Sequence, residues 1–109
     1  MVNVDLEKFA QAIRETYPGY TSQLAQGYAK LWAQQMHPLL QPALQSWIDG
    51  KPWEDVEYQP KGGKRYSVRS IMALRGSKDC LQAMLLLSEY IRDSRRGEAR
   101  ILMPRRDGR

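Results

Sequence analysis

The stretch YSVRSIMALRGSKDCLQAMLLLSEYIRD, residues 66–93, decides the fold, because it contains two helix-like runs separated by Gly76. Hydrophobic periodicity predicts one helix over about residues 68–75 and a second from Ser77 to about Asp93. A helix, a short turn with glycine and a second helix is also the outline of the helix-turn-helix motif that binds DNA. The stretch therefore has two interpretations, a DNA-reading motif or a structural helical hairpin.

The second of these helices decides between the two interpretations. At 100° per residue its apolar side chains cover about half of its circumference; they are Leu81, Ala83, Met84, Leu87, Tyr90 and Ile91. Three of the six residues on the remaining strip are acids, which the phosphates of DNA repel. Only Lys78 and Gln82 suit contact with DNA. We therefore favour a central core helix in a structural hairpin over a recognition helix.

Two further helices are predicted at the N-terminus. The first begins near Asn3 or Asp5 and ends at Pro18. The second begins at Thr21 or Ser22, either of which can cap it. Its large apolar residues fall close to one face, which we expect to be buried; they are Leu24, Tyr28, Leu31, Trp32 and Met36.

A break follows, because His37 precedes a proline and Pro42 repeats the interruption. A third helix then carries an apolar stripe that includes Trp47, which we expect in the core, as we do Trp32. This helix ends at Gly50, whose type suits the left-handed position after a helix.

The central segment, residues 53–66, has no helical period and reads as a short hairpin or an ordered extended loop. Its aromatic residues, Trp53, Tyr58 and Tyr66, either pin this excursion to the helices or stack on unpaired bases; we favour pinning. The predicted fold is all-α, a compact bundle of about five helices with this short extended loop or hairpin. Residues 1–94 form a single helical domain, and residues 95–109 form a basic C-terminal tail.

Size and composition fit this fold. A chain of 109 residues suits one domain. Cys80 is the single cysteine, so no internal disulfide can form, which is typical of a reducing compartment. No secretory signal pattern and no membrane-spanning run is present. We expect a cytoplasmic protein with no membrane partner.

The charge is distributed unevenly. Residues 1–60 carry four basic and seven acidic residues, a net charge of −3, whereas residues 61–109 carry thirteen basic and five acidic residues, a net charge of +8. Such asymmetry favours an anionic partner for the C-terminal half, although a solvated basic tail gives the same count. The candidate nucleic-acid-binding residues are Lys61, Lys64, Arg65, Arg69, Arg75, Lys78, Arg95, Arg96, Arg105 and Arg106.

Catalytic and metal chemistry find little support in the sequence. A nucleophile pair of His37 and Cys80 would need a third group that orients it, and a buried inert thiol is the simpler reading. No zinc or calcium spacing occurs, and the acids at 54, 55 and 57 read as a solvated group. Gly62-Gly63-Lys64 lacks the rest of a phosphate-binding loop. We predict a protein that is not an enzyme and holds no cofactor or metal.

Two functions remain. The chain gives the impression of a small bacterial or phage-type protein, and the first function is contact with DNA or RNA through the basic C-terminal half. The second is a protein interaction module, binding a partner or itself, with no role for nucleic acid. The second predicts an exposed apolar patch, which we expect at Leu39, Leu40 or residues 101–103.

Overall fold

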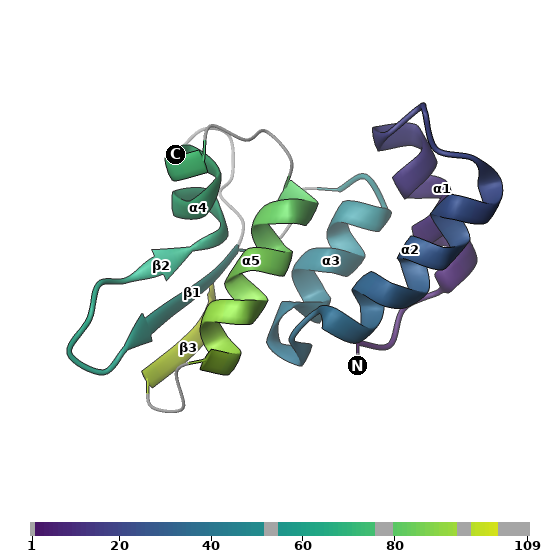
Figure 1. Cartoon of the computed structure of the whole chain (residues 1–109). Helices are drawn as coiled ribbons and strands as arrows, with labels where there is room; N and C mark the ends of the chain where they lie inside the picture. Colours follow the sequence, from purple (N-terminus) through teal and green to yellow (C-terminus); the bar gives the residue numbers. More distant parts are fainter. Residues whose placement is uncertain (1, 52–54, 76–79, 94–96, 103–109) are drawn as a thin grey trace.

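Five α-helices, one 3₁₀ helix and three β-strands form the part of the chain that the computed structural model describes, residues 2–51, 55–75, 80–93 and 97–102. In chain order they are α1 (Leu6–Thr16), α2 (Ser22–Gln35), η1 (Pro38–Leu40), α3 (Gln41–Ile48), β1 (Asp55–Pro60), β2 (Tyr66–Ser67), α4 (Val68–Arg75), α5 (Cys80–Asp93) and β3 (Gly97–Leu102). The helices lie in the regions where the sequence predicts them (Figure 1). The fold is mainly helical but carries a small antiparallel sheet, which corrects the all-α prediction.

Side chains just before three of the helices satisfy their first backbone N–H groups. The Asp5 carboxylate accepts two N–H bonds from the first turn of α1, at 3.0 and 3.3 Å. The Thr21 hydroxyl accepts the N–H of Leu24 at 3.1 Å, and the Ser67 hydroxyl accepts the N–H of Ser70 at 3.1 Å. Each such cap contributes about 0.5–2 kcal/mol of stability. The cap expected from the sequence at Thr21 or Ser22 is confirmed at Thr21.

The predicted break before Pro42 is a sharp corner built around His37. Its imidazole Nδ1 accepts the N–H of Leu39 at 3.1 Å and so caps η1. Its own backbone N–H donates to the hydroxyl of Ser88, 2.9 Å away on α5. That hydroxyl in turn donates to the carbonyl of Met84 at 2.9 Å. The corner is therefore tied to α5 through one buried serine.

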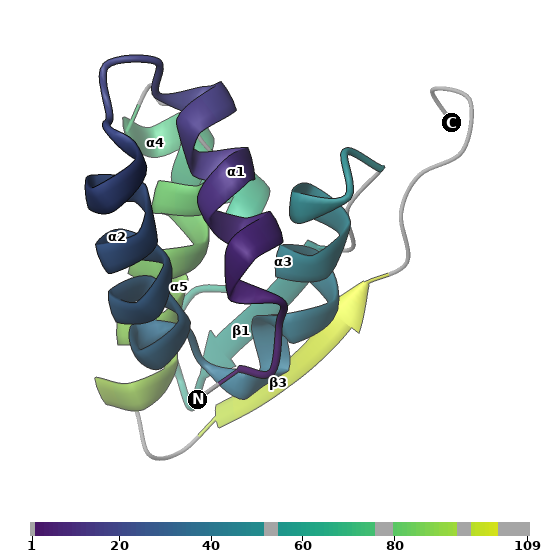
Figure 2. The same cartoon turned by 90° about the vertical axis from the view of Figure 1, so that its right-hand side faces the viewer.

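Helix α2 lies against α1 (Figure 2), and three of its four buried residues are alanines. Its buried residues are Ala25, Ala29, Trp32 and Ala33. Leu24 and Leu31, expected on the buried face, are 50% and 43% exposed. The physical reason is that the face of α2 formed by its alanines and Trp32 is the buried one, and at 100° per residue Leu24 and Leu31 fall outside that face. The prediction for these two leucines was wrong.

Helix α5 is the core helix that the sequence predicts. Its buried residues are Cys80, Leu81, Ala83, Met84, Leu87, Ser88 and Ile91. Tyr90, expected on the same face, is instead 37% exposed and its ring lies 5.1 Å from that of Tyr66. Helix α4 packs against α5. The turn expected at Gly76 and Ser77 lies outside the described residues.

Strand β1 is the centre of a three-stranded antiparallel sheet with the order β2-β1-β3. Tyr58 pairs with Tyr66 on one side, which confirms the hairpin alternative. Val56 and Tyr58 are buried, so one face of the sheet belongs to the core. Gly62 has a φ of 75° in the hairpin loop, where a side chain would be strained.

Strand β3 lies in the segment that the sequence analysis assigned to the basic tail. It pairs with β1 along its whole length, from Asp55 opposite Leu102 to Pro60 opposite Gly97. A two-stranded hairpin is only marginally stable in water, and a third strand satisfies the second edge of β1. Residues 97–102 are therefore part of the sheet.

Candidate functional site

The outer face of the sheet brings together charged residues from β1, from β3, from the loop just before β2 and from the start of α4. Figures 1 and 2 show α4 and α5 on one face of the sheet and no described helix on the other. Because side chains alternate along a strand, Val56 and Tyr58 point to the helices and Glu57 and Gln59 to the other face. Register places Arg100 directly opposite Glu57.

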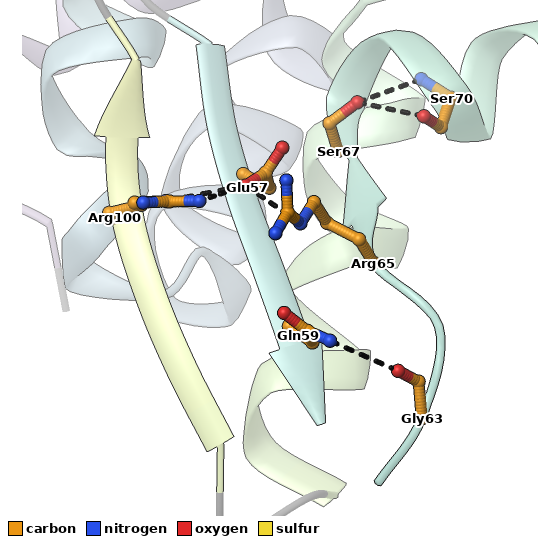
Figure 3. A network of polar contacts seen from close by, with 7 residues as sticks. All are labelled: Glu57, Gln59, Gly63, Arg65, Ser67, Ser70 and Arg100. Atoms are coloured by element: carbon orange, nitrogen blue, oxygen red, sulfur yellow. Dashed lines mark hydrogen bonds and ion pairs between the residues drawn. The ribbon is translucent and has the colours of Figure 1, made fainter. Parts of the chain in front are cut away.

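Glu57 holds two arginines at once (Figure 3). Its Oε1 lies 3.2 Å from Nε of Arg65 and 3.0 Å from Nη2 of Arg100. The Glu57 side chain is 16% exposed, whereas those of Arg65 and Arg100 are 55% and 59% exposed. Two positive charges share one negative charge, so the cluster keeps a net charge of +1. Each guanidinium has five N–H donors, and one carboxylate oxygen does not use them all.

Asp55 forms a second, more buried pair at the junction of β1 and α4. Its Oδ2 lies 3.4 Å from Nε of Arg69, and its Oδ1 accepts the N–H of Val56 at 2.9 Å. Burial raises the pKa of Asp55, and the charge of Arg69 opposes this rise, as do the backbone N–H groups of Val56, Val68 and Arg69. The carboxylate thus fastens the start of α4 to the sheet. The Arg69 side chain stays 51% exposed.

The hairpin loop adds exposed lysines at the end of the same sheet. Lys61 and Lys64 are both exposed, and the amide of Gln59 donates to the carbonyl of Gly63 at 3.4 Å. The described cations of this surface, which we call the sheet surface, are Lys61, Lys64, Arg65, Arg69 and Arg100. Among the described residues, the acids that form ion pairs with these cations are Asp55 and Glu57.

Four of the ten predicted binding residues therefore come together at the hairpin and the start of α4. They are Lys61, Lys64, Arg65 and Arg69. Arg75 is the last residue of α4, and its side chain lies outside the described set. The other five also lie outside the described residues: Lys78, Arg95, Arg96, Arg105 and Arg106. Arg100 was absent from the predicted set; its sequence signal was the apolar alternation around it, which is typical of a strand.

Helix α5 is poorly suited to lie in a DNA groove. One side of it is buried in the core. Gln82, one of the two residues that suited DNA contact, has its amide 3.5 Å from the hydroxyl of Tyr17. Lys78, the other, lies outside the described residues. The structural hairpin remains the better interpretation of the opening stretch.

The remaining aromatic and reactive side chains have structural surroundings. Tyr58 is buried, which contradicts its use as an exposed base-stacking ring, and Tyr66 packs against Tyr90. Trp53 lies outside the described residues. Cys80 is buried, and burial lowers the pKa of His37, with Arg92 adding to that effect. Among the described residues, no three His, Cys, Asp or Glu side chains gather as a metal site.

The apolar patch of the interaction hypothesis does not lie at Leu40, one of the places where we expected it. Leu40 is fully buried in the core and Leu39 is half-buried. The side chains at 101–103 lie outside the described set. Trp47 is only partly buried, with its ring 6.2 Å from Phe9 in an edge contact.

No family model matches the chain, and no characterised protein or solved structure is significantly similar to it. In the described ranges, no helix has the length and apolar character needed to cross a bilayer.

Proposed function

We propose that the protein is not an enzyme and that its sheet surface contacts the phosphate backbone of DNA or RNA. The observation that carries this proposal is the pair of arginines on Glu57, both more than half exposed on the uncovered face of the sheet. Arginine presents a rigid fork of donors that matches the oxygens of a phosphate. The shared carboxylate holds both forks in place before a ligand arrives.

The charge balance supports an anionic ligand. Five described cations face two acids on this surface, and one of those acids, Asp55, is buried against Arg69. Contacts of this type give affinity and orientation and carry little sequence information. We therefore propose binding that depends on salt and varies little with sequence, for a cytoplasmic protein of a small bacterial or phage type.

The test is fluorescence anisotropy with labelled duplex DNA, single-stranded DNA and RNA across a salt series. The variant is Arg65→Gln with Arg100→Gln, and the matched control is Arg14→Gln with Lys8→Gln on α1, which removes the same charge elsewhere. Each lost phosphate contact reduces the slope of log K against log salt by about 0.9 on duplex DNA. We expect a reduction of about 1.8 in the variant and a smaller change in the control. Equal slopes in variant and control, or no binding at low salt, would refute the proposal.

A second candidate function, a protein interaction module, is favoured by a different surface. Helix α2 exposes Leu24 and Leu31, and a groove lined in part by Trp32 and Gln35 of the same helix shares no residue with the sheet surface. The two functions are therefore compatible on one chain, and separate variants can test them.

A further inference from the structure

The loop between β1 and β2 projects from one end of the sheet. Figure 1 shows it extending away from the helices, past the end of β3. Residues 61–64, which we call the hairpin arm, are all exposed. The arm has the sequence Lys-Gly-Gly-Lys, and no acidic residue occurs in the sequence between Glu57 and Asp79. It is therefore a narrow, exposed segment whose side-chain charges are all positive.

A defined turn holds the arm in one shape. The backbone N–H of Gly63 donates to the carbonyl of Pro60 at 3.0 Å, which closes a four-residue β-turn. Gly62, the third residue of that turn, has a φ of 75°, the sign that a type II turn requires at this place. The amide of Gln59 also donates to the carbonyl of Gly63, at 3.4 Å. A segment that already has its shape loses less conformational entropy when it binds a ligand.

The arm is narrow enough for the major groove of B-form DNA. Pro60 is the last residue of β1 that pairs with β3, so among the described residues only the two limbs of the hairpin extend beyond it. Two paired strands lie about 4.8 Å apart. The major groove, about 12 Å wide, admits a two-stranded ribbon, whereas the minor groove is only about 6 Å wide. Double-stranded RNA has a major groove that is too narrow for side chains to read.

The arginine pair on Glu57 lies at a suitable distance from the arm. Lys61 follows Glu57 by four residues, so their Cα atoms lie at most about 14 Å apart. A groove about 12 Å wide and 8.5 Å deep places the middle of its floor about 10 Å from either phosphate strand. When Arg65 and Arg100 contact one of these phosphate strands, the arm is therefore within reach of the groove floor.

The chemistry of the arm fits the base edges in this groove. A lysine ammonium carries three N–H donors and no acceptor. Every base pair presents acceptors in the major groove, N7 and O6 of guanine or N7 of adenine with O4 of thymine. Lysine donors therefore add affinity on any sequence, which agrees with binding that varies little with sequence.

The sheet is poorly equipped to bind single strands. Proteins that bind single-stranded nucleic acid stack successive bases on exposed aromatic rings. The aromatic residues of β1 and β2 are Tyr58, which is buried, and Tyr66, whose ring packs against that of Tyr90. Neither presents a stacking surface on the outer face of the sheet, so a duplex is the better ligand.

We propose that the hairpin arm enters the major groove of duplex DNA, where Lys61 and Lys64 donate to base edges. Arg65 and Arg100 contact the phosphates beside the groove at the same time. This inference rests on the proposed function and adds to it the kind of nucleic acid and the groove.

The test compares three forms of one labelled duplex by fluorescence anisotropy at constant low salt. The first is unmodified, the second carries bulky substituents on C5 of its pyrimidines, which fill the major groove, and the third is saturated with netropsin, which fills the minor groove. The arm variant is Lys61→Gln with Lys64→Gln. Lys30→Gln with Lys51→Gln is the matched control, since both lysines are exposed and lie outside the arm. Circular dichroism confirms that each variant is folded.

The three duplexes should separate the arm variant from the control. On the unmodified duplex we expect the arm variant to bind about tenfold more weakly than the wild type, because two charge-assisted hydrogen bonds are lost. The control should lose much less. On the duplex with the filled major groove, which excludes the arm, the arm variant should bind no more weakly than the control. The netropsin-bound duplex should keep the difference seen without netropsin.

Three results overturn the groove assignment. They are an arm variant equal to the control on the unmodified duplex, an arm variant still weaker than the control when the major groove is filled, and single-stranded DNA that binds the wild type as tightly as the duplex. In each case the proposed function stands if Arg65→Gln with Arg100→Gln still lowers the salt slope. A wild type that binds no DNA at low salt overturns the proposed function as well.

Discussion

Replacing Ser88 by alanine tests whether one hydroxyl holds the corner between α2 and α3 against α5. The Ser88 side chain is fully buried, accepts the N–H of His37 at 2.9 Å and donates to the carbonyl of Met84. Alanine removes the acceptor and leaves the His37 N–H without its partner. An unpaired buried donor costs about 1–3 kcal/mol, and the low end applies because His37 is only half-buried.

A compensating gain makes the expected loss smaller. Alanine is about 0.5 kcal/mol more favourable than serine inside a helix. The net loss in the free energy of unfolding is therefore about 0.5 kcal/mol, which lowers the melting temperature by about 2–4 °C in a domain of this size. Ser22→Ala, at an exposed position of α2, is the matched control and should change stability far less.

Two measurements decide this prediction. Urea denaturation gives the change in the free energy of unfolding, and amide hydrogen exchange reports on the His37 N–H itself. We expect faster exchange at His37 in Ser88→Ala and unchanged exchange in α1. If the melting temperature moved by less than about 1 °C and His37 exchange were unchanged, the hydroxyl would not hold the corner.

Two titratable groups give further predictions. Burial lowers the pKa of His37 from its ordinary 6.5. The stability that neutral His37 contributes is therefore full above about pH 6.5 and is lost as pH falls through the lowered pKa. Denaturation measured from about pH 8 to about pH 5 should show this loss in the wild type and much less of it in His37→Asn, which keeps a capping oxygen. The charge of Arg69 lowers the pKa of Asp55 against the larger rise that burial causes, so Arg69→Met should raise that pKa further, whereas Arg65→Met should not. The pKa of Asp55 in the folded chain lies above its ordinary 3.8, so the stability that the protonated carboxyl contributes is full below pH 3.8 and is lost as pH rises through the folded pKa. A carboxyl NMR titration measures the change in this pKa.

Local signals in the sequence predicted local structure well. Asp5, Thr21 and Ser67 cap helices as their residue types suggest, because a cap needs only its own neighbouring N–H groups. The break at His37 follows from proline sterics in the same way. The exposure of Leu24 and Leu31 on α2 was not predicted, because it depends on which face of the helix its neighbours cover.

Local sequence signals could not predict which distant segments pair with each other in the sheet. Strand β3 joins β1 from some forty residues away along the chain, and its short apolar alternation does not say which edge it pairs with. Arg100 was missed as a site residue for this reason, since only the register places it opposite Glu57. Arg65 and Arg69 were found because they lie next to the hairpin and the cap that the sequence does signal.

The sheet order β2-β1-β3 has a consequence for the nascent chain on the ribosome. Helices α1 to α3 are translated first. Strand β1 then emerges before β3, the strand that pairs with one of its edges, has been synthesised. At a synthesis rate of about 5–20 residues per second, the interval from Pro60 to Gly97 lasts about 2–7 s. During that time one edge of β1 offers bare N–H and C=O groups to other chains. Asp55 and Glu57 on that strand would meanwhile place charge beside the open edge, which disfavours pairing with a second nascent copy of itself.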